Sequence, residues 1–202
     1  MKPNRIIVVL LFITIPFFSY KFAKRYNFNS DLKVGQVIDS LNGVSVYYNG
    51  GVDNTNGRNL SSDNYNIGIK YQCVEFVKRY YFEHLNHKMP DSYGHAKDFF
   101  DDTLRDGHLN EKRNLIQYLN GSAFKPKPDD LIIFDGTAFN KYGHVAIISK
   151  VTDNEIEIIQ QNPGPYGKSR ERLNLIFKDN KWSVNKSHTL GWLRINRGSS
   201  TQ

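Results

Sequence analysis

The 202-residue chain contains one cysteine, Cys73, at a point where a polar loop gives way to a helical pattern. From Val74 onward, apolar residues recur at spacings of three and four with charged residues between them, which predicts an amphipathic helix. A thiol in the first turn of this helix faces unpaired backbone N–H groups and the positive end of the helix dipole. Both favour the thiolate, the nucleophilic form of cysteine. A lone cysteine is more often a small core residue, so a catalytic interpretation of Cys73 requires a partner.

The partner is predicted 71 residues later, at His144. Two short apolar runs rich in β-branched residues, 131–134 and 145–148, predict buried strands, and His144 stands at the start of the second. A histidine there can keep a fixed orientation, take a proton from a thiol and return it to a leaving amine. By itself, a strand-end histidine bonded to a loop is the plainer interpretation. Together with a cysteine at a helix start, it matches the arrangement of Cys/His hydrolases, whose two residues meet in space.

Three short blocks around these residues resemble the signatures of CHAP domains, the cysteine, histidine-dependent amidohydrolases/peptidases. The resemblance is strongest to the amidase domain of glutathionylspermidine synthetase/amidase, and it covers roughly residues 42 to 195. It implies an α+β, papain-like fold, with N-terminal helices packed on a bent antiparallel β-sheet and preceded here by one N-terminal hydrophobic helix. The residues that carry it are Tyr71-Gln72-Cys73-Val74-Glu75-Phe76, Pro128-Asp129-Asp130-Leu131-Ile132-Ile133-Phe134, Gly143-His144-Val145-Ala146-Ile147-Ile148, Gln161-Asn162 and Leu190-Gly191-Trp192.

The resemblance implies acyl transfer to water through a thioester, with Cys73 as nucleophile and His144 as base. Related chains commonly hold a glutamate at the position of Gln160, just after a predicted strand at 155–159. An amide oxygen can still accept the second ring N–H and fix the tautomer, but it lacks the charge that stabilises an imidazolium. We therefore expect Gln160 to orient His144, and we expect a slower enzyme or a higher thiol pKa than in those relatives.

Two further polar side chains are candidates for the site. Gln72 could donate to a developing oxyanion beside the Cys73 backbone N–H, and Asn162 could orient the histidine or the substrate. Ordinary loop hydrogen bonding accounts for both residues equally well. No cofactor is expected, and no metal is predicted. Asp53-Asn54-Thr55-Asn56-Gly57 resembles the start of a calcium loop, but its glycine comes one position too early and the final glutamate is missing.

The N-terminus is distinct in charge. The chain has 27 basic and 20 acidic residues, and five of the basic residues fall in the first 25 positions, which hold no acid. The remainder is nearly balanced, which argues against a nucleic-acid surface. An uncharged run at 6–20 predicts contact with a membrane as a signal anchor; a cleaved signal peptide, giving a secreted protein, is favoured less because no small-x-small site follows. The predicted organisation is an anchor or signal peptide at 1–25, a tether at 26–41, the catalytic domain at 42–196 and a tail at 197–202.

The substrate stays open between three alternatives. A catalytic domain held outside the cytoplasm, in the periplasm or beyond the cell, would meet peptidoglycan peptides in the cell wall. The family resemblance favours instead an amide between glutathione and a polyamine. In the third alternative, Gln160 marks a weakened or inactive site that is kept as a module binding the cell wall or a partner. A second helix is also predicted at 96–109.

Overall fold

The computed structural model describes residues 3–196, so the predicted tail at 197–202 lies outside the described residues. An eight-stranded antiparallel sheet forms most of the domain, in the order β11-β10-β9-β8-β7-β12-β6-β5. The strands are β5 (His108–Asn110), β6 (Leu115–Leu119), β7 (Leu131–Phe134), β8 (His144–Val151), β9 (Glu155–Ile159), β10 (Arg170–Lys178), β11 (Lys181–Val184) and β12 (Thr189–Ile195). The predicted antiparallel sheet is confirmed, and the domain is mostly β with few helices.

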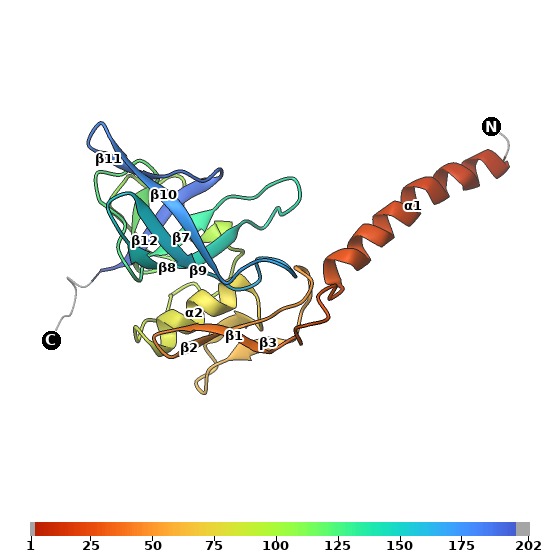
Figure 1. Ribbon diagram of the computed structural model, residues 1–202, viewed down its shortest axis with the longest axis horizontal. Helices are drawn as coiled ribbons and strands as arrows, with labels where there is room; N and C mark the ends of the chain where they lie inside the picture. Colours follow the sequence, from red (N-terminus) through yellow and green to blue (C-terminus); the bar gives the residue numbers. More distant parts are fainter. Residues whose placement is uncertain (1–2, 197–202) are drawn as a thin grey trace.

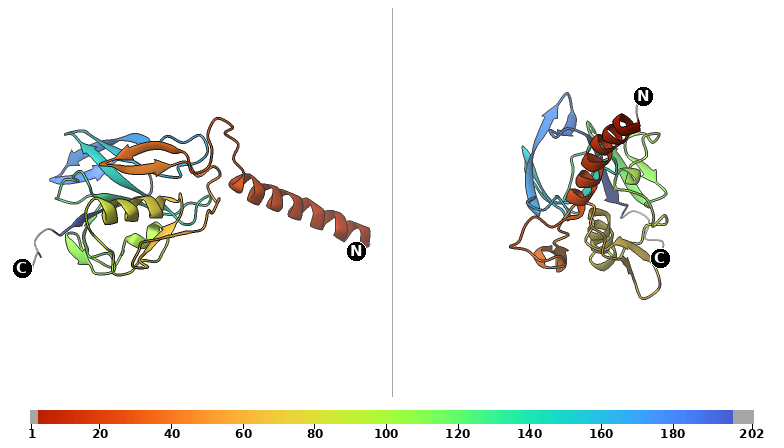
Figure 2. Two further views of the ribbon diagram at one scale, coloured as in Figure 1. Left: turned by 90° about the horizontal axis from the view of Figure 1, so that it is seen from below. Right: turned by 90° about the vertical axis from the view of Figure 1, so that its right-hand side faces the viewer.

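A second layer covers one face of this sheet. It consists of helix α2 (Cys73–Glu83) and two hairpins, β1 (Val37–Leu41) with β2 (Val44–Tyr47) and β3 (Arg58–Leu60) with β4 (Asn66–Ile69). The helix contacts β8 from the sheet and β2 and β4 from the hairpins (Figures 1 and 2). The first residue of the helix therefore lies close to the sheet strand that begins with His144.

The central strands are apolar throughout because both of their faces are covered. In β7, Leu131 and Ile133 pack with α2, whereas Ile132 and Phe134 pack on the opposite face against side chains of β8 to β11. Continuous apolar runs are what a strand buried on both sides requires. Burial on both faces holds β7 and β8 firmly, and β8 carries His144.

The predicted helix is confirmed as α2, but its charged side is not exposed to solvent. Its charged residues Glu75, Lys78 and Arg79 are 2%, 1% and 5% exposed, because the two hairpins cover the side of the helix that was expected to face water. Gly68 of β4 allows this cover: a Cβ there would lie 3.0 Å from the Glu75 Cα, and its φ of +142° also favours glycine. The helix is thus a central element whose charged groups must find partners inside the protein.

The prediction of a second helix at 96–109 is wrong. Among residues 26–196, α2 is the only α-helix of the domain. The chain there forms one 3-10 turn, Lys97–Phe99, and then an irregular segment. The side chain of Gln117 binds both backbone groups of Asp101, with Oε1 2.9 Å from the N and Nε2 2.7 Å from the O. These bonds replace the helical ones, and Phe99 is fully buried.

The N-terminal residues form helix α1 (Pro3–Arg25), which projects away from the domain (Figures 1 and 2). Within residues 3–196, none of the helices is sufficiently long and apolar to cross a membrane. The segment after α1, predicted to be a tether, packs on the domain instead. Gly35 donates its backbone N–H to the Tyr48 carbonyl at 2.8 Å, and Tyr48 donates to the Gln36 carbonyl at 2.9 Å.

Candidate active site

Cys73 is the first residue of α2, as predicted. The preceding residue, Gln72, is extended, with φ −85° and ψ 158°, and Tyr71 has a φ of +68° that turns the chain into the helix. The backbone N–H groups of Val145, Val74 and Cys73 itself lie near enough to the thiol to lower its pKa. Val145 directly follows His144 in β8. The fold therefore places the Cys73 thiol near the start of β8, the strand that begins with His144.

His144 is held from its other side by Gln160. The His144 Nε2 lies 2.8 Å from the Gln160 Oε1, and the Gln160 Nε2 donates to the Lys168 carbonyl at 3.1 Å. Since the amide nitrogen is committed to that carbonyl, the amide oxygen must face the ring and accept from it. His144 therefore carries its proton on Nε2, and Nδ1 is the free base. The orienting arrangement predicted for Gln160 is present in the structure.

Both reactive side chains favour their neutral forms. Burial raises the pKa of the Cys73 thiol to about 11, and the three N–H groups at its sulfur oppose this less strongly. Burial likewise lowers the pKa of His144 to about 4, against the smaller opposing effect of Gln160. The N–H groups at the helix start lower the thiol pKa as expected, but the opposing effect of burial is larger. Each residue keeps part of its surface exposed, so a substrate can reach it.

Gln72 and Asn162 meet each other and a neighbouring loop. Gln72 Nε2 donates to the carbonyls of Val52 and Asn54 at 3.2 and 2.7 Å, and its Oε1 accepts from Asn162 Nδ2 at 2.7 Å. An oxyanion role for Gln72 would require one of its two donated bonds to break. Asn162 also donates to the Val52 carbonyl at 2.9 Å, while its Oδ1 is buried without a partner among the described residues.

Comparison with known proteins decides the family. A model of the CHAP domain matches residues 63–162, the part of the chain that holds Cys73, His144 and Gln160. This chain belongs to the CHAP domain family. It is 33% identical over 131 residues to the trypanothione synthetase of Crithidia fasciculata, covering 63% of this chain and 20% of that protein. It is 31% identical over 147 residues to the bifunctional glutathionylspermidine synthetase/amidase of Escherichia coli (strain K12), covering 67% of this chain and 23% of that protein.

The CHAP domain chain thus spans about a fifth of the length of these curated relatives, and its family is one of hydrolases and amidases. Among solved structures it is similar to Ly7917 bound to the hydrolysing product of MDP. The TM-score is 0.37 and the identity 16%, over 62% of this chain and 54% of that chain.

Sequence reasoning assigned no role to Gln161, which joins the two halves of this CHAP domain site. It is fully buried directly after Gln160, and its Nε2 donates to the Gln72 carbonyl at 3.0 Å and to Glu75 Oε2 at 2.8 Å. Its Oε1 accepts from the Tyr47 backbone N–H at 2.7 Å. Gln161 therefore fixes the end of β9 to the start of α2. The one signal for it was its place in the Gln-Asn pair that carried the family resemblance.

Glu75, which accepts from Gln161, also forms a buried ion pair. Glu75 Oε1 lies 2.7 Å from Arg79 Nε, with 3% and 6% of the two side chains exposed, and it also accepts from Asn59 Nδ2 at 2.9 Å. A second guanidinium nitrogen of Arg79 donates to the Ser45 carbonyl at 2.8 Å. Both carboxylate oxygens have donors, so the charges are paired and hydrogen-bonded as burial demands. Within residues 3–196, no three His, Cys, Asp or Glu side chains gather to hold a metal.

Proposed function

We propose that this chain is a Cys/His amidohydrolase that cleaves an amide bond through a thioester intermediate. One arrangement carries the proposal: the Cys73 thiol lies near the Val145 N–H, and the preceding residue, His144, has its Nε2 2.8 Å from the Gln160 Oε1. A nucleophile, a base and a group that orients the base are the parts that acyl transfer by a cysteine needs.

The reaction begins from a neutral pair. The Nδ1 of His144 takes the thiol proton as the sulfur attacks the amide carbonyl, so the thiolate forms only while a substrate is bound. The Gln160 oxygen holds the resulting imidazolium through its Nε2–H, and backbone N–H groups at the start of α2 stabilise the developing oxyanion. His144 then gives the proton to the leaving amine, which departs as the thioester forms. A water deprotonated by His144 hydrolyses the thioester and regenerates the thiol.

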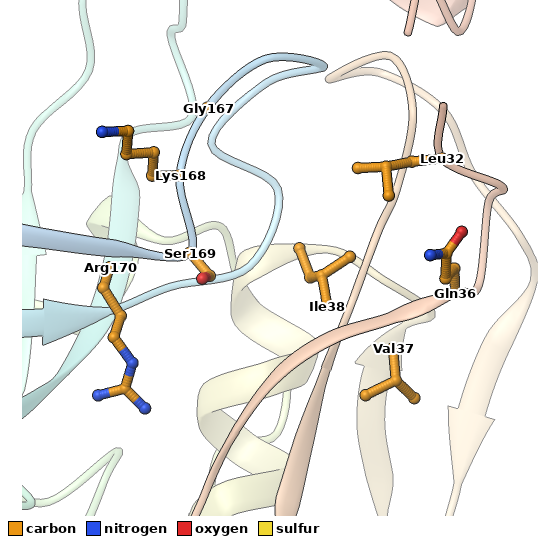
Figure 3. Close-up of a pocket in the computed structure, with 8 residues that line it drawn as sticks. All are labelled: Leu32, Gln36, Val37, Ile38, Gly167, Lys168, Ser169 and Arg170. Atoms are coloured by element: carbon orange, nitrogen blue, oxygen red, sulfur yellow. The ribbon is translucent and has the colours of Figure 1, made fainter. Parts of the chain in front are cut away.

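An open groove of about 570 Å³ lies on the surface between residues 32–38 and residues 167–170 (Figure 3). Neither Cys73 nor His144 lines it, and its link to them is indirect. On one wall, Ile38 packs against the same core cluster as Cys73. On the other, the Lys168 and Ser169 carbonyls accept from the side chain and backbone of Gln160. We therefore place the peptide part of the substrate in this groove, which is lined by Leu32, Gln36, Val37, Ile38, Gly167, Lys168, Ser169 and Arg170.

Two substrate classes follow from different observations. The printed name of the Escherichia coli relative includes an amidase of glutathionylspermidine, which supports an amide between a γ-glutamyl peptide and a polyamine. Export of the domain would support a peptide bond in peptidoglycan. A third proposal, a binding module for the cell wall or a partner, rests on the uncharged Gln160, which stabilises an imidazolium less than a carboxylate would.

The deciding experiment incubates the full chain with glutathionylspermidine and, separately, with purified peptidoglycan fragments, and follows products by mass spectrometry. We expect products from one of the two, and none from Cys73→Ala. Turnover that survives in Cys73→Ala would end the thioester mechanism. Binding of either compound without products, in a wild type whose Cys73 is reduced, would favour the binding module.

The location outside the cytoplasm is a proposal of its own. It rests on the uncharged run at 6–20 between flanking cations, which is typical of an export signal or anchor. Placing a charge in this run with Val9→Asp should keep the protein in the cytoplasm on cell fractionation. An unchanged distribution between fractions would show that the run does not direct export, and would remove the argument for a cell-wall substrate.

A further inference from the structure

The docking segment, residues 24–29 at the end of α1, lies where three loops of the domain converge. The loop at 50–54 holds Gln72, the neighbour of Cys73. The loop at 137–142 leads through Gly143 to His144, and the loop at 163–166 follows the Gln160 to Asn162 stretch. Each of the three residues in the proposed mechanism is thus adjacent to one loop that this segment touches. The segment also precedes the region matched by the CHAP family model, residues 63–162.

Lys24 ties two of these loops together. Its Nζ lies 3.3 Å from Asp53 Oδ2 and donates to the Phe139 carbonyl at 3.2 Å. Its backbone carbonyl accepts from the Asp53 N–H at 2.9 Å. Since only 19% of the Lys24 side chain is exposed, this cation is held in place more firmly than an ordinary surface lysine. One residue therefore links the loop beside Gln72 to the loop before His144.

Two further bonds secure the third loop, and one more ties the segment to the core. Asn29 Nδ2 donates to the Pro165 carbonyl at 3.1 Å, and the Tyr166 hydroxyl donates to the Phe28 carbonyl at 2.7 Å. The buried Tyr48 donates its hydroxyl to Asn27 Oδ1 at 2.7 Å. The docking segment is therefore bound from both sides of the site.

The close approach at Gly51 shows that the fit is specific. A Cβ at this position would lie 2.5 Å from the Lys24 carbonyl oxygen and 2.5 Å from the Arg25 carbonyl carbon, closer than carbon atoms can pack. Only glycine permits the two backbones to meet at this distance. The next residue in the loop, Val52, presents its carbonyl to both Gln72 and Asn162. Gly51 and Val52 therefore connect the docking segment to Gln72 and Asn162.

We propose that the docking segment is a positioning part of the active site, which keeps Cys73, His144 and Gln160 aligned by holding their three loops. The proposal rests on the proposed amidohydrolase function. It assigns positioning roles to Lys24, Asn29 and Tyr166, none of which touches the reacting atoms. Loss of docking should slow the reaction of Cys73 while the folded core, with its ion pair and both apolar clusters, stays intact.

The test measures alkylation of Cys73 by iodoacetamide at pH 7 in the full chain, which requires no identified substrate. Lys24→Met removes both Nζ contacts, and Tyr166→Phe removes only the bond to Phe28. We expect rates lower by roughly 3–10-fold and 2–3-fold, because small misalignments of reacting groups cost rate steeply. Lys24→Arg keeps the cation and should restore most of the rate. Lys181→Met and Tyr93→Phe, which change exposed residues away from the segment, serve as matched controls at the wild-type rate.

Thermal melting of each variant separates positioning from folding. The proposal predicts slower alkylation with a Tm within about 3 °C of the wild type, as for other surface substitutions. It is overturned if Lys24→Met and Tyr166→Phe match their controls, or if the rate falls only in step with the Tm. Tyr166→Phe decides the case if Lys24→Met does not fold. His144→Ala separates the two proposals: if it slows alkylation and the docking variants do not, only the docking proposal fails.

Discussion

Two consecutive glutamines at the end of β9 serve two different polar arrangements. Gln160 accepts from His144, and burial favours the neutral imidazole there and the neutral thiol of Cys73. Gln161 binds Glu75, which is buried as an ion pair with Arg79. Both arrangements lie at the contact between α2 and the sheet, and both are largely buried. They differ in whether the charge is permanent.

The difference follows from what each arrangement must do. A permanent charge inside a protein requires every one of its hydrogen-bonding positions to be filled, and the Glu75 carboxylate meets that demand with donors on both oxygens. A group that gives up and takes back a proton cannot be held so completely. Gln160 offers one acceptor to the ring and no charge, so either protonation state of His144 can exist in turn. The ion pair of Glu75 and Arg79 supports α2, whereas the neutral Cys73 and His144 can exchange a proton.

Removing one charge of the ion pair gives the largest expected effect. Arg79→Met leaves Glu75 buried beside Gln161 without its cation, which should lower the free energy of unfolding by about 3–5 kcal/mol. Urea unfolding measures the loss. The double variant Glu75→Gln, Arg79→Met removes both charges and should recover part of it. A loss below about 1 kcal/mol in the single variant would mean that the pair does not support α2 as described.

Lys78 sharpens the comparison, because this third buried charge of α2 has no carboxylate partner among the ion pairs of residues 3–196. Its Nζ donates to the Ser92 carbonyl at 2.7 Å and to the Asn66 carbonyl, and it lies 4.7 Å from the centre of the Tyr65 ring. Burial lowers the pKa of Lys78 to about 7. The two carbonyl acceptors do not fully replace the water that the Lys78 ammonium group loses on burial.

The lowered pKa of Lys78 predicts that the free energy of unfolding rises with pH. Between pH 7 and about 10.4 the unfolded chain keeps the Lys78 proton and the folded chain releases it, so stability contributed by this group rises with pH. The free energy of unfolding should gain about 2–4 kcal/mol across this range relative to Lys78→Met. Urea unfolding of both proteins at pH 7 and pH 10 gives the difference. A gain equal in the two proteins would show that Lys78 is charged when folded.

Local patterns predicted much of this structure, and what they missed shares one cause. Cys73 at a helix start and His144 at a strand start follow from short-range periodicity, as do strands β7, β8 and β9. The burial of Glu75 and Arg79 does not, because it depends on hairpins from a stretch that is polar and loop-like in sequence. The neutral state of the Cys73 thiol depends in the same way on packing from distant segments.

The failed prediction of a helix at 96–109 has the same cause. The Asp101 backbone is held by Gln117, sixteen residues later, and no local pattern contains that bond. Docking of residues 24–29 likewise depends on loops from three distant parts of the chain. Residue pairs that meet across the fold are recognisable from one sequence only where a family resemblance names them, as it did for Cys73, His144 and Gln160.

Placing a carboxylate beside His144 should have a smaller effect than the changes at Arg79 and Lys78. Gln160→Glu places a carboxylate on the His144 Nε2–H, which favours the imidazolium and raises the pKa of His144 from about 4. Alkylation of Cys73 at pH 7 should rise by about tenfold, equivalent to one pKa unit. The acid limb of the pH profile should move upward, since the base is now protonated at a higher pH.

Gln160→Ala is the control for that substitution: it removes the acceptor without adding charge and should slow alkylation. The Lys168 carbonyl, which now accepts from Gln160 Nε2, would face a carboxylate oxygen in Gln160→Glu. A wild-type rate in Gln160→Glu together with an unchanged acid limb would show that Gln160 does not influence the ring.

The most direct measurement compares iodoacetamide alkylation of Cys73 at pH 7 in the wild type and in His144→Ala. A thiol with a pKa near 11 is almost wholly protonated at this pH, so its reaction depends on a base in contact with it. We predict that His144→Ala reacts about 10²-fold more slowly, the usual contribution of a positioned base. The advantage of the wild type should vanish below pH 4, where His144 is protonated, and shrink towards pH 11, where the thiol ionises unaided. Equal rates at pH 7 would contradict the account, because they would show that the imidazole does not act on the sulfur.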